Sequence, residues 1–379
     1  MAGNVSGSAV FSLKYDETPP AATATPSRAA DSNGWYNHAL TVSFAGSDAM
    51  SGLEACDPTK SYSGPDAAGA SIAGACRDLA GNVAPRTVVV KYDGTAPQVT
   101  ATPGRAANAD GWYNAPLSVT FAGTDAFSGV ASCVAPQSYA GPDNAAAAVA
   151  GSCVDQAGNV GARSFGLKYD ATAPQATASP GRPADANGWY NHALAVSFAG
   201  TDATSGIVSC DGAKSYTTPD TASASLAGTC LDRAGNRSSS ASFAFKYDAT
   251  APAVTASPSR QPNATGWYRA PLTVGFAATD ATSGLQSCDA DKTYAGPDDA
   301  SATVGGSCRD QAGNAGTASF PLKYDATAPQ ATGVPSRVPN ANGWYNAPLT
   351  VSFGGTDATS GLESCPAAQS YSGPDSGSA

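Results

Sequence analysis

Aspartates that recur at three fixed positions are the side chains in this sequence best suited to bind an ion. One lies in the phrase Asp-x-Thr, one begins Asp-Ala-x-Ser-Gly, and one begins Asp-x-Ala-Gly-Asn. The complete sets are Asp16, Asp48 and Asp78; Asp93, Asp125 and Asp155; Asp170, Asp202 and Asp232; and Asp248, Asp280 and Asp310, while Asp325 and Asp357 form an incomplete set. Calcium takes about six to eight oxygen ligands, so three carboxylates brought together would suit it. The alternative is that each carboxylate accepts hydrogen bonds from the backbone of its own turn.

The cysteines also follow a fixed spacing. Four pairs lie 20 residues apart: Cys56 and Cys76, Cys133 and Cys153, Cys210 and Cys230, and Cys288 and Cys308. Zinc needs four ligands, and these pairs have no histidine nearby. We therefore predict a disulfide within each pair, worth roughly 3 kcal/mol for a loop of this length, and an oxidising compartment. Cys365 is left unpaired, because its partner would fall beyond residue 379.

The residues needed for catalysis are scarce. The two histidines, His38 and His192, occupy a slot where other copies of the pattern carry Ala, so we interpret both as surface residues. No nucleophile elbow, phosphate-binding glycine loop or His-Glu-x-x-His motif occurs. Five Trp-Tyr pairs could stack on sugars or could cover the end of a core. The sequence predicts no catalytic site and no cofactor other than calcium.

These residues belong to a repeat of about 77 residues. The tryptophans at 35, 112, 189, 267 and 344 are separated by 77 or 78 residues, and every other phrase keeps that step. The unit is too long for a solenoid repeat and long enough for a small domain. We expect residues 1–15 to be the C-terminal strand of a preceding or truncated repeat. Repeats should follow at 16–92, 93–169, 170–247 and 248–324, with a truncated repeat at 325–379.

The local pattern within each repeat is that of strands. Leu40, Val42 and Phe44 alternate with smaller residues, which predicts a strand with one buried face. A last strand is expected at Val88, Val90 and Tyr92, with Lys91 facing outward. Turn residues recur every 8 to 12 positions, as in a β-sandwich. Cys56 has the wrong strand parity relative to Leu53 for both to face inward, unless a β-bulge lies between them.

Several of these phrases point to a known family. Tyr-Asp-x-Thr-Ala-Pro, Asp-x-Ala-Gly-Asn, Asp-Ala-x-Ser-Gly and Gly-Trp-Tyr together resemble the tandem immunoglobulin-like domains of bacterial surface and secreted proteins. The resemblance covers essentially the whole chain and implies extracellular stalks, adhesins or appendages of secreted enzymes. The cysteine pairs depart from the commoner cysteine-free members. In such a sandwich, the three aspartates of a set would meet at the end where the chain enters the domain.

Charge and hydropathy exclude some partners. The net charge of −10 argues against nucleic acid and anionic membranes. No segment has the ~18 to 20 apolar residues needed to span a bilayer, and the first ten residues lack the features of a signal peptide, so we expect any export signal to lie outside this sequence. Neighbouring repeats in a longer chain are the partners expected first.

The predicted architecture is an all-β, extended rod of immunoglobulin-like sandwiches. Its expected function is that of an extracellular or cell-surface spacer that presents other domains or contributes to adhesion. Three alternatives stay open: an array binding surface glycans or proteins with avidity, an accessory region of a secreted hydrolase, and a self-assembling filament. In the filament, the strand Val10–Tyr15 of one chain would complete the open repeat of the next, head to tail.

Overall fold

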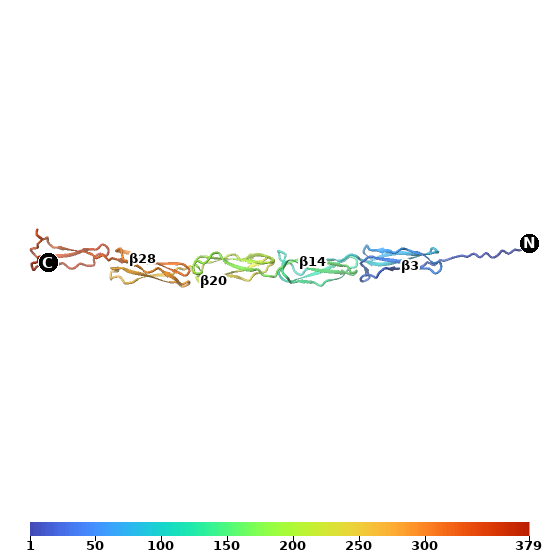
Figure 1. Cartoon of the computed structure of the whole chain (residues 1–379), viewed down its shortest axis with the longest axis horizontal. Coiled ribbons are helices and arrows are strands. Elements are labelled where there is room, and N and C mark those ends of the chain that lie inside the picture. The colour runs from blue at the N-terminus through green and yellow to red at the C-terminus, as the bar shows by residue number, and fades with distance from the viewer. Residues whose placement is uncertain (379) are drawn as a thin grey trace. The chain divides into compact units, whose positions relative to one another are not determined.

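The computed structural model describes residues 1–378 and contains only β-strands as regular structure within that range (Figure 1). Contacts group the chain into two units. The first comprises residues 1–175, 200–209 and 230–239, and the second comprises 176–199, 210–229 and 240–379. Residues 1–20 form no strand, so the prediction of a strand within residues 1–15 stays a prediction. None of the described residues forms a helix long and apolar enough to cross a membrane.

Repeats 1, 2 and 4 each carry two sheets. In repeat 1, the first sheet has the order β1 (Ala21–Pro26), β3 (Leu40–Ser47) and β5 (Lys60–Tyr62). The second has the order β2 (Trp35–Tyr36), β7 (Val83–Tyr92), β6 (Ala67–Asp78) and β4 (Leu53–Cys56). All pairings are antiparallel except that between β2 and β7. Two sheets packed face to face form a β-sandwich.

The later repeats follow this plan, except that in repeat 3 the strands β18 and β21 form a separate two-stranded sheet. Repeat 2 contains β8 (Gln98–Pro103), β9 (Trp112–Tyr113), β10 (Leu117–Thr124), β11 (Val130–Cys133), β12 (Gln137–Tyr139), β13 (Asn144–Asp155) and β14 (Val160–Tyr169). Repeat 3 contains β15 (Gln175–Pro180), β16 (Trp189–Tyr190), β17 (Leu194–Thr201), β18 (Ile207–Cys210), β19 (Lys214–Tyr216), β20 (Thr221–Gly228), β21 (Cys230–Asp232) and β22 (Ala241–Tyr247). Repeat 4 contains β23 (Ala253–Pro258), β24 (Trp267–Tyr268), β25 (Leu272–Thr279), β26 (Leu285–Cys288), β27 (Lys292–Tyr294), β28 (Asp299–Asp310) and β29 (Ala315–Tyr324).

The final segment has one sheet, formed by β30 (Gln330–Pro335), β31 (Leu349–Thr356) and β32 (Gln369–Tyr371). Equivalent strands therefore recur about every 77 residues, because β3, β10, β17, β25 and β31 begin at residues 40, 117, 194, 272 and 349. The prediction of an all-β fold built from tandem sandwiches is confirmed. The exact repeat boundaries stay predictions.

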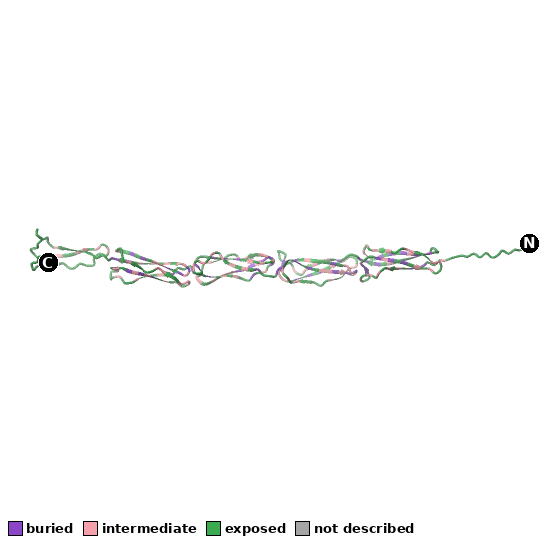
Figure 2. Ribbon diagram, viewed as in Figure 1, coloured by how far each residue is buried: buried purple, intermediate pink, exposed green. Residues whose placement is uncertain are grey.

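Alternating side chains build each core, as the period of two in the sequence predicts. Leu40, Val42 and Phe44 are buried on β3, and they pack against Ile72 of β6 and Val90 of β7. Figure 2 shows buried and exposed residues alternating along the strands of each complete repeat. In the final segment the equivalent Phe353 is 37% exposed, because no second sheet covers it.

The β-bulge considered from the cysteine parity is present. Cys56 of β4 lies directly opposite Cys76 of β6, and the register shifts between Leu53 and Ala55. The same shift occurs between Val130 and Ser132 and between Leu285 and Ser287. Leu53 remains 37% exposed, so the bulge turns the cysteine toward the core without burying the leucine.

The Trp-Tyr pairs form short strands that join the last strand of their own repeat. Trp35 and Tyr36 pair in parallel with Lys91 and Tyr92. The Lys91 ammonium lies 5.8 Å from the centre of the Trp35 ring, close enough for a cation–π contact. Trp35, Trp112 and Trp189 are each only 7% exposed. In these repeats the aromatic pair covers the end of a core and offers no open face for a sugar.

Candidate functional site: the linkers between repeats

The preceding repeat binds the linker through its backbone and through one carboxylate. Between repeats 1 and 2, the N–H of Asp93 donates to the carbonyl oxygen of Tyr36 at 2.9 Å. The Gly94 N–H donates to Asp66 Oδ1 at 2.8 Å, and the Thr95 hydroxyl donates to Asp66 Oδ2 at 2.5 Å. Asp66 therefore ties the linker back to the repeat that it leaves.

The following repeat binds the same linker from the other side. The Asn159 side-chain amide donates to the carbonyl oxygens of Asp93 and Thr95, at 2.9 and 3.3 Å. The Ser128 N–H donates to Asp93 Oδ2 at 3.0 Å. Because both neighbours hold the same few residues, the linker has little freedom to bend without breaking hydrogen bonds.

We call this arrangement the linker clamp, formed by an Asp of the preceding repeat and an Asn of the following one. The clamp Asp residues are Asp66, Asp143, Asp220 and Asp298, each bound to the hydroxyl of a linker threonine. The clamp Asn residues are Asn159, Asn236 and Asn314, and Asn82 makes the same contacts to residues 16 and 18. The role of the clamp Asp was not predicted from the sequence, although the phrase Tyr-x-x-Pro-Asp recurs in every repeat.

The predicted aspartate triplets do come together at these linkers. In each of the four sets, one carboxylate oxygen per residue lies within 4.8 Å of those of the other two. Their oxygens also accept backbone hydrogen bonds: Asp125 Oδ1 accepts from Gly129 at 2.8 Å, and Asp155 Oδ1 accepts from Asn159 at 2.8 Å. Both interpretations from the sequence are therefore compatible with the geometry. The calcium site stays a prediction.

Burial and hydrogen bonding shift the pKa values of the carboxylates at a linker in opposite directions. Burial raises the pKa of Asp170 and Asp248 above the ordinary value, and the charge of the nearby Asp202 or Asp280 adds to this effect. Donation from the Thr172 hydroxyl and the Ala171 N–H lowers the pKa of the clamp residue Asp143. Donation from the Thr327 hydroxyl and the Ala326 N–H lowers the pKa of Asp298 in the same way. Asp143 and Asp298 thus favour their charged forms.

A second contact joins successive repeats beside the linker. The Asn33 side-chain amide, on a loop of repeat 1, donates to the backbone oxygen and to Oε1 of Gln156 in repeat 2, at 3.2 and 2.9 Å. Asn187 of repeat 3 donates to the same two atoms of Gln311 in repeat 4, at 2.9 and 3.1 Å. We call these contacts the amide bridges.

The equivalent contact between repeats 2 and 3 differs. There the Asn108 side-chain amide donates to the backbone oxygen of Arg233 at 2.7 Å. Asp110, which occupies the position of Asn33 in its repeat, makes no such contact within the described residues. The bridge is therefore specific to the repeats that carry Asn before the glycine.

Disulfides close the predicted loops. Cys56 is bonded to Cys76, Cys133 to Cys153, and Cys288 to Cys308. Cys210 and Cys230 are also disulfide-bonded, and Cys365 is an exposed free cysteine. His38 and His192 are largely exposed and lie 3.6 Å from Asp31 and Asp185, respectively.

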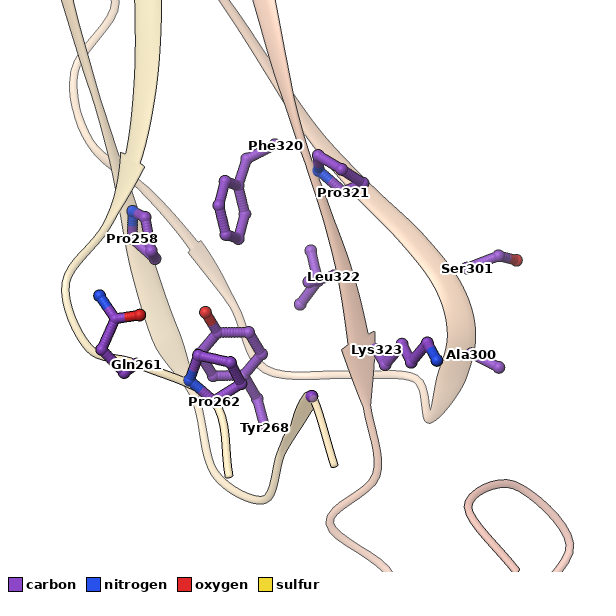
Figure 3. Close-up of a pocket in the computed structure, with 11 residues that line it drawn as sticks. Pro258, Gln261, Pro262, Tyr268, Ala300, Ser301, Phe320, Pro321, Leu322 and Lys323 are labelled. Carbon is purple, nitrogen blue, oxygen red and sulfur yellow. The ribbon is translucent and has the colours of Figure 1, made fainter. Parts of the chain in front are cut away.

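A groove of about 530 Å³ opens in repeat 4 (Figure 3). Its walls are mainly apolar and include Pro258, Pro262, Tyr268, Phe320 and Leu322. In repeat 1, Arg28 binds Asp31 at 2.7 Å and lies 5.0 Å from the centre of the ring of Tyr36, the residue equivalent to Tyr268.

Repeat 4 lacks the carboxylate that holds this arginine. It carries Asn263 in place of Asp31, and its Arg260 is exposed, 5.9 Å from the centre of the Tyr268 ring. Repeat 2 also carries Asn at this position, Asn108, and its Arg105 lies 5.3 Å from the centre of the Tyr113 ring, so the loss of the ion pair is shared by both repeats.

No protein-family model matches the sequence, and the search of curated proteins found no match. Among solved structures, it is similar to a tetra-tandem repeat in the extending region of a large adhesion protein, with 20% identity and a TM-score of 0.29 over 81% of this chain and 100% of that one. It is also similar to the N-terminal eight Ig domains of Down Syndrome Cell Adhesion Molecule (10% identity, TM-score 0.28, 89% of this chain and 52% of that one). Cadherin domains 3–6 of protocadherin gamma B2 give 11% identity and a TM-score of 0.23 over 69% of this chain and 84% of that one. These likenesses concern the arrangement of strands alone.

Proposed function

We propose that the chain is an extracellular spacer, an extended rod of sandwiches that holds other domains away from a cell surface. The observation that carries the proposal is the linker clamp, because it is complete at the three linkers that join repeats 1 to 4. Hydrogen bonds from both neighbours to a linker of a few residues oppose bending, as a spacer requires. The disulfides add resistance to unfolding and fit an oxidising, extracellular location.

Small-angle X-ray scattering of the full chain tests this proposal. We expect a maximum dimension on the order of 150 Å or more for the rod, from strands of about eight residues at ~3.3 Å per residue. A variant with all four clamp Asp residues replaced by Ala should show a smaller radius of gyration with unchanged circular dichroism. Asp110→Ala is the matched control, because this exposed residue lies outside the clamp. A compact wild-type chain, or a clamp variant that is as extended as the wild type, would contradict the proposal.

A second candidate is a ligand-binding array, and the groove of repeat 4 is the observation that favours it. Its apolar walls and the nearby Lys323 and Gln261 would suit a small ligand with one polar edge. Binding should disappear in Phe320→Ala and persist in Phe165→Ala, the equivalent change in repeat 2. If neither the full chain nor its single repeats bind to a glycan and peptide array, this candidate function is wrong.

A further inference from the structure

Two tight turns place an Asn-Gly pair at the amide bridges. Asn33 and Gly34 are the central residues of a hairpin turn in which the Trp35 N–H donates to the Ser32 oxygen at 2.7 Å. Both residues have positive φ, 48° and 80°, as the turns preferred by Asn-Gly in hairpins require. Asn187 and Gly188 repeat this turn in repeat 3, with the same φ values of 48° and 80°.

The glycine N–H distinguishes these turns from the others. Among the described residues, the N–H groups of Gly34 and Gly188 donate to no acceptor. In the other repeats the corresponding group is bound: Gly111 donates to the Asn108 oxygen at 3.0 Å, and Gly343 donates to the Asn340 oxygen at 2.9 Å. The glycine nitrogen that follows Asn342 is therefore engaged, whereas the one that follows Asn33 is not.

We propose that Asn33 and Asn187 are sites of spontaneous deamidation that release the amide bridges. The backbone nitrogen of the following glycine attacks Cγ of the asparagine, the new C–N bond closes a succinimide, and the Cγ–Nδ2 bond breaks. Nδ2 leaves as ammonia with the proton from the glycine N–H. Water then adds to either ring carbonyl and yields aspartate or isoaspartate, so no oxidant or cofactor is needed. Glycine permits the ring closure because it has no Cβ to obstruct it.

The product cannot make the contact that the amide makes. A carboxylate has no donor for the backbone oxygen of Gln156, and it adds a negative charge beside this residue, which directly follows Asp155 in the sequence. The Gln156 side chain could rotate and donate its own amide, but the backbone oxygen would lose its partner. In repeat 2, Asp110 stands at this position and makes no such hydrogen bond within the described residues, and Asn108 binds Arg233 of repeat 3 instead.

Peptide mapping by mass spectrometry tests the chemical step on the intact, disulfide-bonded chain. The protein is kept in mildly alkaline buffer at 37 °C, and fragment spectra follow the mass gain that accompanies exchange of NH2 for OH. We expect Asn33 and Asn187 to convert at least several-fold faster than Asn342. The variant Asp110→Asn supplies a matched control within a complete repeat, and it should also convert slowly because the Gly111 N–H is bound. Conversion that is equal at Asn342, or absent at Asn33 and Asn187, would overturn the proposal.

The variant Asn33→Asp tests the consequence for the bridge. It should fold normally, since Asp, like Asn, tolerates the positive φ of this position. Hydrogen exchange of the amides in residues 155–159 should become several-fold faster than in wild type, while the same hairpin of repeat 4, residues 310–314, should be unchanged. If the amides of residues 155–159 exchange at the same rate in the variant as in the wild type, deamidation does not release the bridge. Neither experiment depends on whether the chain acts as a spacer.

Discussion

At the scale of single residues, the clamp works because a charged carboxylate meets donors that are already fixed by the fold. Asp143 accepts from the Ala171 N–H at 2.9 Å and from the Thr172 hydroxyl. Such bonds to a charged acceptor are stronger than those between neutral groups. Asp170, which directly precedes Ala171 in the linker, has the opposite tendency, because burial raises its pKa.

The pH dependence follows from the lowered pKa of Asp143. A group whose folded-state pKa lies below its unfolded value stabilises the protein fully above the ordinary value of 3.8, and this contribution disappears as the pH falls through the folded-state pKa. We expect a carbon-13 titration of Asp143, with a chelator present, to give a value below 3.8. Asp143→Ala should cost about 1 kcal/mol at pH 7, after allowance for partial exposure. Asp110→Ala should stay within about 0.5 kcal/mol. An ordinary titration of Asp143 would contradict this assignment.

The aspartate triplets make a separate prediction about calcium. Three carboxylates within 4.8 Å repel one another, and a divalent cation would remove that repulsion. We therefore expect millimolar calcium to raise the melting temperature of the full chain, and magnesium, which demands a smaller and more regular site, to do so less. Asp125→Asn should reduce the calcium response of repeat 2 and leave that of repeat 4 intact. If calcium changes neither the melting curve nor the scattering profile, the carboxylates serve only to cap their turns.

How far these residues could be predicted depends on where their partners lie. Asp125, Asp155 and Asp93 could be grouped from the sequence, because a sandwich brings their loops to one end. The role of Asp66 could not be predicted, because its partner Thr95 belongs to a linker 29 residues away. The amide bridges were also missed, since their partners are separated by 123 or 124 residues and belong to different repeats.

At the scale of the elements, glycines on the long central strand make room for a phenylalanine of the facing sheet. A Cβ built on Gly74 of β6 would lie 2.6 Å from the Phe44 ring, and Gly306 meets Phe276 at the same distance. Real side chains essentially never approach so closely, and Phe44 is buried between the sheets. The glycine is therefore required by packing and not by backbone conformation.

A pair of substitutions on β6 tests this packing. Gly74→Ala should destabilise repeat 1 by about 1–3 kcal/mol, because the added methyl group overpacks the core. Gly69→Ala lies on the same strand, where the nearest atom would be 3.8 Å away at Val89, and it should be close to neutral. Denaturant unfolding followed by fluorescence measures both changes. Equal effects at the two positions would show that the lost glycine flexibility, and not the Phe44 ring, governs the result.

Most strands could be predicted from the sequence, but the pairing of the Trp-Tyr strand could not. Alternation at Leu40, Val42 and Phe44 is a strong signal because it follows the period of a strand with one buried face. The parallel pairing of Trp35 and Tyr36 with β7 was not predicted, because two residues are too few to show any period. The bulge beside Cys56 was inferred only as a way to reconcile two parities, and the structure contains it.

At the scale of the whole molecule, each disulfide limits how far a repeat can be extended under load. Cys133 and Cys153 are 20 residues apart in sequence and directly opposite each other on β11 and β13. When a repeat unfolds under tension, the chain between its two cysteines cannot lengthen. The length of a spacer built this way would therefore increase less if one of its repeats unfolded.

Single-molecule pulling of the full chain from its ends measures this restriction. Each disulfide closes a loop of 20 residues, and an extended residue spans at most ~3.3–3.6 Å. Reduction should therefore lengthen the unfolding step of each repeat by on the order of 70 Å. The double variant Cys133→Ser, Cys153→Ser should show one long step among unchanged shorter ones without any reductant, and that repeat should unfold at lower force because the loop is no longer closed. Reduction should then lengthen the remaining steps to match it. Steps of equal length before and after reduction would mean that the disulfides do not limit the extension of an unfolded repeat. The proposal that the disulfides help the spacer to resist tension would then be wrong.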